Sequence, residues 1–442
     1  MNNIPLPADV INDRINQYGL PEPGIASIRE IVFLANQIEK ATGIQFIKME
    51  MGVPGLPAPS IGIEAEITAL RNGVAAVYPD IRGILILKDE ASRFIRLFLN
   101  LNVNPEGCIP TVGSMMGGMV SFLVANRNDR TKEGTLFIDP GFPVQKQQVK
   151  MLGHDYHSFD IYNYRGKKLR AKLESYLETG KISSLLYSNP NNPSWICLND
   201  EELSIIGEMA NKYDVIVIED LAYLGMDFRK DYSIPGKPPY QPTVGRYTDD
   251  YILLISSSKI FSYAGQRIGL MAISNHLFTR QYPDLLRYYS SDKFGYSVIF
   301  GALYGLSAGV THSAQYGLTA MLKAVNDGTY RYRDDVIEYG EKAAIMKKMF
   351  TDNGFKIVYD TDLDEPIADG FYFTISYPGM SGGELLKELL RYGISAISLN
   401  IAGSERSEGL RACVSLIPRE RFGDLEIRLK KFFKDHPQYK TK

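Results

Sequence analysis

One lysine follows a run of residues typical of a buried strand and has phosphate-binding side chain types on both sides. The segment Tyr251–Leu270 opens with apolar, β-forming residues, continues through three serines to Lys259, and then reaches Arg267. The apolar run predicts one buried strand that ends at the serines. Burial disfavours the charged form of a lysine and lowers its pKa, so that the neutral amine can attack a carbonyl and form an imine. Serine and arginine side chains close by would donate hydrogen bonds to a phosphate.

A single small molecule would use all of these groups. Imine formation at Lys259 needs a carbonyl compound, whereas Ser256, Ser258 and Arg267 suit an anion. Pyridoxal phosphate carries both an aldehyde and a phosphate, so the segment favours it as the cofactor. The alternative is a strand end with solvated polar residues, since most lysines lie on protein surfaces.

A second anion-binding segment is predicted around Gly113 and Ser114. A short strand at 108–112 runs into this small-residue turn, and an apolar helix follows. The N–H groups and the dipole of a helix start attract anions, and a glycine lets the backbone approach them closely. A plain helix cap would also explain the Gly-Ser pair.

The order of the motifs resembles that of the class I/II aminotransferases, which belong to the fold type I pyridoxal-phosphate enzymes. The resemblance extends from about Phe46 to Ser415 and therefore covers most of the chain. The matching motifs are G-x-P-x-x-x-x-P from Gly52 to Pro59, N-P-x-N-P from Asn189 to Pro193, D-x-x-Y from Asp220 to Tyr223, S-x-x-K-x7-R from Ser256 to Arg267, and an arginine at position 411 within an apolar strand pattern.

The resemblance implies that Lys259 is the catalytic residue. It would hold the cofactor as an aldimine, remove the α-proton of an amino acid as a general base, and return it as a general acid. An ionised Asp220 would keep the pyridine nitrogen protonated, which makes the ring an electron acceptor. The implied cofactor-binding residues are Ser114, Met115 through its backbone, Phe142 stacked on the ring, Asn192 and Tyr223 on the ring oxygen, Asp220, Ser256, Ser258, Lys259, Arg267, and Tyr78 from a neighbouring subunit.

The resemblance also implies three substrate-binding positions. Arg411 would clamp the α-carboxylate with two parallel hydrogen bonds, Asn192 would assist it, and Gly52 would let the backbone approach the carboxylate. Each of three residues has an alternative role. Arg411 could form a surface ion pair, Phe142 could pack in the core, and Tyr78 could be a packed turn residue. No metal-ligand spacing occurs, and we expect no metal.

The motif that begins at Asn189 departs from the family pattern after Pro193. The family continues with Thr-Gly, whereas this chain has Ser194 and Trp195, its only tryptophan. Glycine takes a positive φ readily and tryptophan does so only with strain, so we expect the turn to differ. Trp195 would serve in packing or, as our hypothesis, would narrow the substrate pocket.

Alternating strand and helix patterns before residue 270 predict an α/β domain with a mainly parallel sheet. The resemblance implies the fold type I architecture, with a seven-stranded-type sheet and a smaller α+β domain built from both termini. Helices are expected over Gly24–Thr42 and Leu277–Tyr289. The expected segments are an N-terminal arm and part of the small domain over 1–60, the large cofactor-binding domain over 61–310, linking helices over 311–345, and the small C-terminal domain over 346–442.

Composition excludes few classes of partner. The net charge of −2 gives no reason to expect nucleic acid or an anionic membrane as partner. Three scattered cysteines, at positions 108, 197 and 413, form no pair motif and favour a reducing compartment. The N-terminus lacks a basic start and an apolar core, and no apolar run reaches membrane-spanning length. We therefore expect a cytoplasmic protein, and the resemblance implies a homodimer with shared active sites.

The predicted function is ping-pong transfer of an amino group between an L-amino acid and a 2-oxo acid. A lyase that eliminates a β-substituent, for example at a carbon–sulfur bond, would use the same site. A ligand-sensing domain without catalysis is a further alternative, but such regulators carry an N-terminal DNA-binding domain, for which the roughly 45 residues before the first match are expected to be too few. The amino acid itself is not predicted: loop 226–250, Trp195 and the N-terminal segment would decide it, and Arg229 or Arg246 are candidates to meet a second carboxylate.

Overall fold

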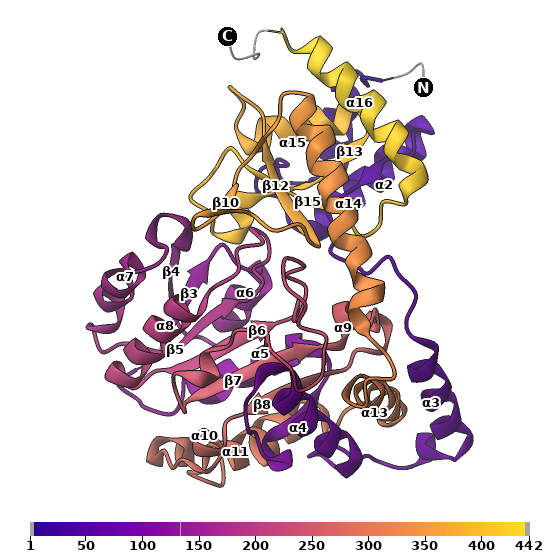
Figure 1. Ribbon diagram of the computed structural model, residues 1–442. Coiled ribbons are helices and arrows are strands. Elements are labelled where there is room, and N and C mark those ends of the chain that lie inside the picture. Colours follow the sequence, from indigo (N-terminus) through magenta and orange to yellow (C-terminus); the bar gives the residue numbers. More distant parts are fainter. Residues whose placement is uncertain (1–3, 133, 438–442) are drawn as a thin grey trace. The chain divides into compact units, whose positions relative to one another are not determined.

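A computed structural model describes residues 4–132 and 134–437, which form two compact units (Figure 1). The larger, here called the sheet unit, comprises Leu56–Asn191 and Cys197–Val336. The smaller, here called the terminal unit, comprises the described residues up to Gly55, the segment Asn192–Ile196, and the described residues from Ile337 onward. The terminal unit draws on both ends of the chain, which confirms the expected smaller domain.

A seven-stranded sheet forms the centre of the sheet unit. Its order is β2-β8-β7-β6-β5-β3-β4. Strand β8 is antiparallel to β2 and β7, and every other neighbouring pair is parallel, which confirms the predicted mainly parallel sheet. The strands are β2 (Cys108–Thr111), β3 (Gly134–Asp139), β4 (Tyr156–Asp160), β5 (Ile182–Ser188), β6 (Ile216–Leu221), β7 (Tyr251–Ser256) and β8 (Gly269–Ile273).

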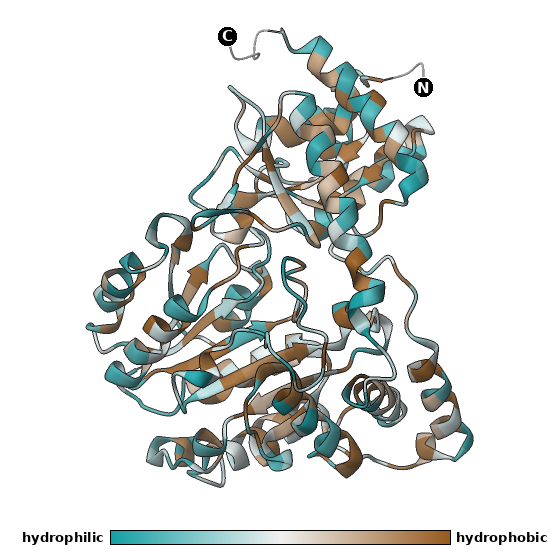
Figure 2. Ribbon diagram, viewed as in Figure 1, coloured by the Kyte–Doolittle hydropathy of each residue, from teal (hydrophilic) through white to brown (hydrophobic). Residues whose placement is uncertain are grey.

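The central strands are apolar along their length because helices cover both faces of the sheet. Every residue of β3, β6, β7 and β8 is buried, whereas the edge strand β4 is partly exposed. In Figure 2 many residues of these strands are brown, and the helices on either side carry both brown and teal residues. Helix α5 (Gly113–Ala125) is apolar nearly all round and packs on the sheet, where Val120 and Phe122 join Leu254 and Met271 in one core.

Helices of the sheet unit begin and end where sequence patterns allow. Helix α8 (Asp200–Tyr213) starts at a capping box formed by Asn199 and Glu202, as such a sequence predicts. The helix expected over 277–289 is wrong in its extent: α10 ends at Thr279, and a 3₁₀ turn begins at Pro283, which has no N–H to continue a helix. The other helices are α3 (Ser60–Arg71), α4 (Leu85–Leu99), α6 (Pro143–Met151), α7 (Lys168–Leu177), α9 (Ser257–Ile260), α10 (Asn275–Thr279), α11 (Phe294–Tyr296), α12 (Tyr304–Ser307) and α13 (His312–Asn326).

The terminal unit is an α+β structure around a four-stranded antiparallel sheet, ordered β14-β15-β12-β9. Helix α2 begins at Ile28 rather than at Gly24, because Ser27 and Glu30 form a capping box there. The strands are β1 (Ile47–Lys48), β9 (Lys356–Ile357), β10 (Thr361–Asp362), β11 (Glu365–Pro366), β12 (Tyr372–Ser376), β13 (Ile394–Ser395), β14 (Ile397–Ser398) and β15 (Leu410–Cys413). The helices are α1 (Ala8–Tyr18), α2 (Ile28–Thr42), α14 (Tyr332–Asp352, whose first residues belong to the sheet unit), α15 (Gly382–Arg391) and α16 (Phe422–Asp435).

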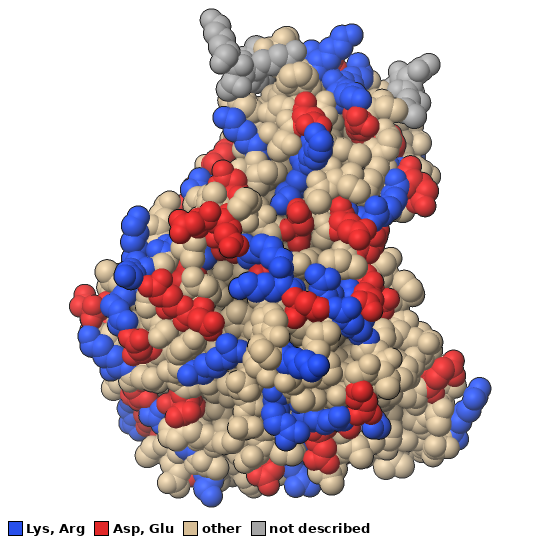
Figure 3. Space-filling view, in the orientation of Figure 1, with Lys and Arg blue, Asp and Glu red and all other residues tan. Residues whose placement is uncertain are grey.

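Charges of both signs are interspersed over the face shown in Figure 3. Ion pairs within each unit join such neighbours, for example Arg419 with Glu338 in the terminal unit and Arg331 with Asp231 in the sheet unit. Among the described helices, none combines the length and apolar character needed to cross a bilayer.

The contact of α8 with the end of loop 226–250 leads to a stability prediction. A Cβ at Gly207 would lie 2.6 Å from Tyr247 Cβ and 2.8 Å from its backbone carbonyl carbon. Since backbone cannot move aside cheaply, Gly207→Ala is expected to lower the free energy of unfolding by about 1–3 kcal/mol. Urea unfolding followed by circular dichroism measures this change.

Gly423→Ala is the matched control, because no atom lies within 4 Å of a Cβ built at Gly423 in helix α16. This variant should be neutral or stabilising by about half a kcal/mol, as expected for alanine in a helix. Equal unfolding midpoints for the two variants would contradict the tight α8–Tyr247 contact.

Candidate active site

Strand register brings the candidate residues of the sheet unit to one edge of its sheet. Ser188 pairs with Asp220 across β5 and β6, and Leu221 pairs with Ile255 across β6 and β7. The antiparallel strand β8 begins at this edge, where Gly269 pairs with both Ser256 and Thr111. Five segments therefore meet at this edge: those that follow β2, β5, β6 and β7, and the one that precedes β8. This carboxyl-end location is where open α/β sheets bind ligands.

Lys259 lies in the first turn after β7, within the short helix α9. Ser256 caps this helix, since its Oγ accepts a hydrogen bond of 3.2 Å from the Ser258 N–H. Ser256 and Ser258 are buried, and Lys259 is half-buried. The end of a buried strand thus holds the lysine at the sheet edge, as predicted from the sequence.

Arg267 lies against the start of helix α5. A Cβ at Gly113, where φ is +66°, would lie only 2.6 Å from Arg267 Nη2. A Cβ at Gly269 would lie 3.1 Å from the Ser114 N, so β8 also approaches this helix start closely. The guanidinium is exposed and sits beside the first N–H groups of α5, where the helix dipole favours an anion. The two predicted phosphate-binding segments, which include Ser114 and Met115, are thus neighbours in the structure.

Asp220 lies near the end of β6 and is buried. Its Oδ2 accepts a hydrogen bond of 2.8 Å from Gln145 Nε2, and its Oδ1 accepts one of 3.1 Å from the Ala222 N–H. Burial raises the pKa of Asp220 to about 6, and these two hydrogen bonds oppose that rise. Sequence reasoning missed Gln145, because a glutamine on a helix carries no sign that its amide faces inward.

Phe142 and Tyr223 follow β3 and β6, two strands that are separated in the sheet by β5. Phe142 follows β3 as the N-cap residue of α6, and Tyr223 is buried just after β6. A hydrogen bond of 2.8 Å from Asn191 Nδ2 to the Pro140 carbonyl links the turn after β5 to the turn before Phe142. The positions of Phe142 and Tyr223 along this edge are set by the positions of β3 and β6 in the sheet.

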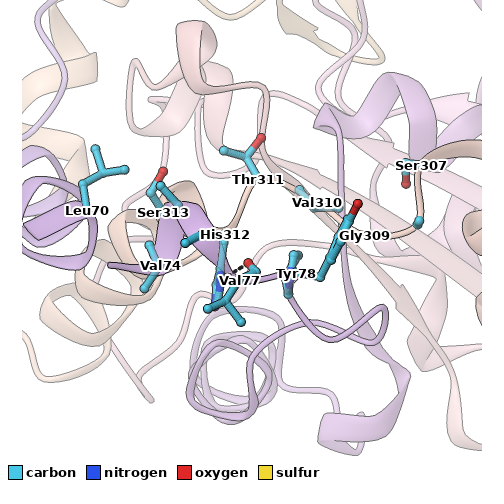
Figure 4. A pocket seen from close by; sticks show the side chains of 14 residues that line it. Leu70, Val74, Val77, Tyr78, Ser307, Gly309, Val310, Thr311, His312 and Ser313 are labelled. Carbon is cyan, nitrogen blue, oxygen red and sulfur yellow. Dashed lines mark hydrogen bonds between the residues drawn. The ribbon is translucent and has the colours of Figure 1, made fainter. Parts of the chain in front are cut away.

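Tyr78 lies on the surface of the sheet unit, with 90% of its side chain area exposed. It lines a pocket of about 620 Å³ with Val77, Gly309 and His312 (Figure 4). His312 Nδ1 lies 3.0 Å from the Val77 carbonyl oxygen, a contact drawn as a dashed line in Figure 4. Tyr78 is therefore not a packed turn residue in this chain.

Arg411 is buried in the terminal unit on β15. Its Nη1 donates a hydrogen bond of 3.3 Å to Asn192 Oδ1, and its Nη2 donates one to the backbone carbonyl of Glu50. Its Nε is buried without a hydrogen-bond acceptor among the described residues. Gly52 lies nearby, and a Cβ there would overlap the Tyr372 hydroxyl at 1.8 Å. The three predicted substrate-binding residues are thus gathered within one unit.

Trp195 adopts a glycine-like conformation, with φ of +65°. The turn after Pro193 is expected to differ because tryptophan takes a positive φ only with strain, but Trp195 adopts a positive φ all the same. The indole is fully buried and packs against Gly370, where a Cβ would lie 1.9 Å from Trp195 Cε2. Close packing, which sequence does not reveal, holds the tryptophan in this conformation.

Loop 226–250 contains no regular element beyond the 3₁₀ turn Val244–Arg246. Arg229 bonds Asp227 at 2.8 and 2.9 Å. Arg246 bonds Asp200 and the carbonyls of Leu99 and Gln241. Both arginines proposed to meet a second carboxylate thus have partners inside the sheet unit.

The chain is similar to several aminotransferases over most of its length. It is 28% identical to a protein named probable aspartate aminotransferase from Methanocaldococcus jannaschii, over 76% of this chain and 82% of that protein. It is 27% identical to an LL-diaminopimelate aminotransferase from Natranaerobius thermophilus, over 70% and 75% of the two chains.

Solved structures share the fold at lower sequence identity. An aspartate aminotransferase double mutant from Thermus thermophilus matches with a TM-score of 0.74 at 16% identity, over 92% of this chain and 96% of that one. An alanine aminotransferase from Pyrococcus furiosus matches with a TM-score of 0.73 at 20% identity, over 92% and 97%.

The family match spans both units. Residues 46–421 match the family described as aminotransferase class I and II, which generally uses pyridoxal phosphate. The match covers far more than half of the chain, including every motif from Gly52 to Arg411. The protein therefore belongs to the class I and II aminotransferases.

Proposed function

We propose that the protein transfers an amino group between an L-amino acid and a 2-oxo acid by a ping-pong mechanism. Pyridoxal phosphate would be held at the edge of the sheet in the sheet unit, and the substrate α-carboxylate would be held by Arg411. The observation that carries the proposal is the convergence of Lys259, Asp220 and the Arg267–Gly113 contact on one sheet edge.

The residues at this edge fit the cofactor's charged groups. Gly113 lacks the Cβ that would fill the space beside Arg267, and the N–H groups of α5 open there, which suits a phosphate. The Asp220 carboxylate is buried, and its hydrogen-bond donors among the described residues are neutral, which suits a cationic ring N–H. Ser256 and Ser258 lie where β7 ends and would add donors to the phosphate.

The bound cofactor would supply an aldehyde that condenses with amines and a ring that withdraws electrons. Lys259 Nζ would take the proton from the substrate α-carbon and later return it, as base and then acid. The Asp220 carboxylate would hold the ring N–H, and Tyr223 and Asn192 would donate hydrogen bonds to the ring oxygen. Phe142 would cover one ring face.

Arg411 fits the α-carboxylate because its guanidinium is buried and incompletely bonded. Its Nε has no acceptor among the described residues, and Asn192 and the Glu50 carbonyl orient its other nitrogens. A carboxylate would satisfy a planar fork of donors with two hydrogen bonds. The relatives are named for aspartate, LL-diaminopimelate and alanine, so these amino acids are the first donors to test.

A second copy of this chain is proposed to complete the site. The pocket that Tyr78 lines has exposed apolar side chains, with Val77 at 60% and Leu70 at 47% exposure. A homodimer would cover this surface and would let Tyr78 reach the partner's phosphate.

The absorbance spectrum of the purified protein with pyridoxal phosphate distinguishes transamination from other reactions. An amino acid donor added without a 2-oxo acid should convert the visible band of the bound cofactor once, with one equivalent of oxo acid released. Lys259→Ala should lower this rate by about 100- to 10,000-fold, because the proton-transfer group is lost. Stopped-flow absorbance measures both effects.

Lys168→Ala, which changes an exposed lysine on α7, is the control and should behave as wild type. Continuous oxo acid production with the band retained would contradict transamination and point to a lyase. The absence of any bound chromophore would overturn the cofactor assignment.

Cofactor binding is expected to depend on pH through Asp220. The Gln145 hydrogen bond stabilises the ionised Asp220 and lowers its pKa, so Gln145→Leu should raise that pKa above about 6. The neutral fraction of Asp220 then grows as pH falls, and a neutral carboxyl holds a cationic ring poorly. The dissociation constant of pyridoxal phosphate should therefore exceed the wild-type value most near pH 6 and approach it above about pH 8.

Absorbance titration of the cofactor-free protein at several pH values tests this. Gln147→Leu changes an exposed glutamine on the same helix and should leave the pH profile unchanged. A Gln145→Leu effect that is equal at every pH would show that the hydrogen bond does not tune Asp220.

Mixed dimers test whether Tyr78 of one copy serves the site of the other copy. Tyr78→Ala and Lys259→Ala should each lower activity, but a mixed dimer contains one site with both residues intact. Equimolar mixing after subunit exchange should restore about a quarter of wild-type activity. Activity that stays at the level of the separate variants would contradict a shared site.

A further inference from the structure

We infer that Tyr372 is a positioning residue for Arg411, and that Trp195, seated on Gly370, holds the Tyr372 ring in place. The inference rests on the proposed role of Arg411 as the carboxylate clamp. All four residues belong to the terminal unit.

Strand register places Tyr372 beside Arg411. Thr374 of β12 pairs directly with Arg411 of β15, so Tyr372, two residues away on the same face, is its diagonal neighbour. Arg411 Cζ lies over the Tyr372 ring at 4.6 Å from the centroid. Both side chains are buried, with 4% and 2% of their areas exposed, so the cation–π attraction is little screened by water.

The ring contributes a restraint that the hydrogen bonds lack. The bonds from Arg411 to Asn192 and to the Glu50 carbonyl act near the plane of the guanidinium. Motion perpendicular to that plane is opposed by the aromatic face beneath it. Tyr372 therefore fixes the position of the guanidinium along the direction perpendicular to its plane, and with it the position of the N–H donors that would bind a carboxylate.

Packing on other sides holds the Tyr372 ring. Its hydroxyl occupies the space where a Cβ of Gly52 would be, at 1.8 Å. The Trp195 ring meets it in a T-shaped contact, with centroids 6.1 Å apart and planes at 67°. Trp195 in turn fills the space where a Cβ of Gly370 would lie, 1.9 Å from Cε2. Gly52 thus leaves room for the Tyr372 ring, and Gly370 leaves room for the Trp195 ring. The Tyr372 ring lies under Arg411.

This arrangement gives Trp195 an indirect role that differs from narrowing a substrate pocket. A narrowed pocket would discriminate among amino acids by their side chains. A displaced guanidinium would instead weaken every ligand that binds through its α-carboxylate, and would spare amines that have none.

Tyr372→Leu tests the inference, because it keeps an apolar side chain but removes the aromatic face. The half-reaction with L-alanine should slow by about 10- to 30-fold in second-order rate constant. Isopropylamine, in which a methyl group replaces the carboxylate of alanine, should react at the wild-type rate. Tyr372→Phe keeps the ring and should stay within about threefold of wild type with L-alanine.

Binding without turnover supplies an independent readout. Trp195 is the only tryptophan of the chain, so its fluorescence reports on this cluster. The holoenzyme is titrated with 2-aminoisobutyrate, which has an α-carboxylate but no α-hydrogen to transfer. Its dissociation constant should rise by the same about 10- to 30-fold in Tyr372→Leu.

Gly370→Ala tests the support of Trp195 without touching Tyr372 or Arg411. The added methyl would displace the indole, so the same carboxylate-dependent loss is expected. Gly423→Ala is the matched control, because a Cβ at Gly423 has no atom within 4 Å. Circular dichroism spectra and unfolding midpoints establish that the variants compared are folded.

The inference is overturned if folded Tyr372→Leu matches wild type with L-alanine, or if it loses L-alanine and isopropylamine activity equally, which would indicate a merely structural role. Losses that differ among amino acids of different side chains would overturn it in favour of a narrowed pocket. A wild-type enzyme that binds pyridoxal phosphate but neither reacts with any amino acid nor binds 2-aminoisobutyrate would refute the proposed function itself, and the inference with it.

Discussion

Burial of charge without a matching opposite charge is the constraint on which the two candidate binding sites depend. Asp220 and Arg411 are both buried, and among the described residues neither has an ion-pair partner within 4 Å. Neutral donors and acceptors compensate each charge only in part, which is why burial raises the pKa of Asp220 to about 6. A cationic ring N–H and a substrate carboxylate would each supply the missing charge. Part of the free energy of ligand binding would therefore come from pairing the buried charges of Asp220 and Arg411.

The sheet gathers its functional groups through register rather than through motif sequence. Parallel strands all end at one edge, and the antiparallel strand β8 begins there. Residues as distant in sequence as Gly113 and Arg267 come together because β2 pairs with β8. Gly113 is needed at this point because both its positive φ and its contact with Arg267 exclude a side chain. The candidate anion site is thus a consequence of strand order.

Sequence predicts those features that depend on local pattern. The apolar runs of β6 and β7, the capping box of α8 and the motifs around Asp220 and Lys259 can all be recognised from neighbouring residues alone. Sequence does not reveal features that depend on which side of an element faces which neighbour. The Gln145 amide, for example, bonds Asp220 of β6 from helix α6. Pro283, by contrast, is a local signal, because it has no N–H to continue a helix beyond α10.

Trp195 shows how a local rule yields to packing. A positive φ at a residue with a Cβ is unfavourable by roughly 1–2 kcal/mol. Burying an aromatic side chain of about 150–250 Å² contributes roughly 4–6 kcal/mol at about 25 cal/mol/Å². The indole is fully buried, so burial outweighs the strain as long as a space of the right shape exists. Gly370 provides that space from a distant segment, and a Cβ there would close it. Trp195, which replaces the glycine of the family's Thr-Gly, therefore depends on Gly370. Gly370 is distant in sequence, and only folding brings the two residues together.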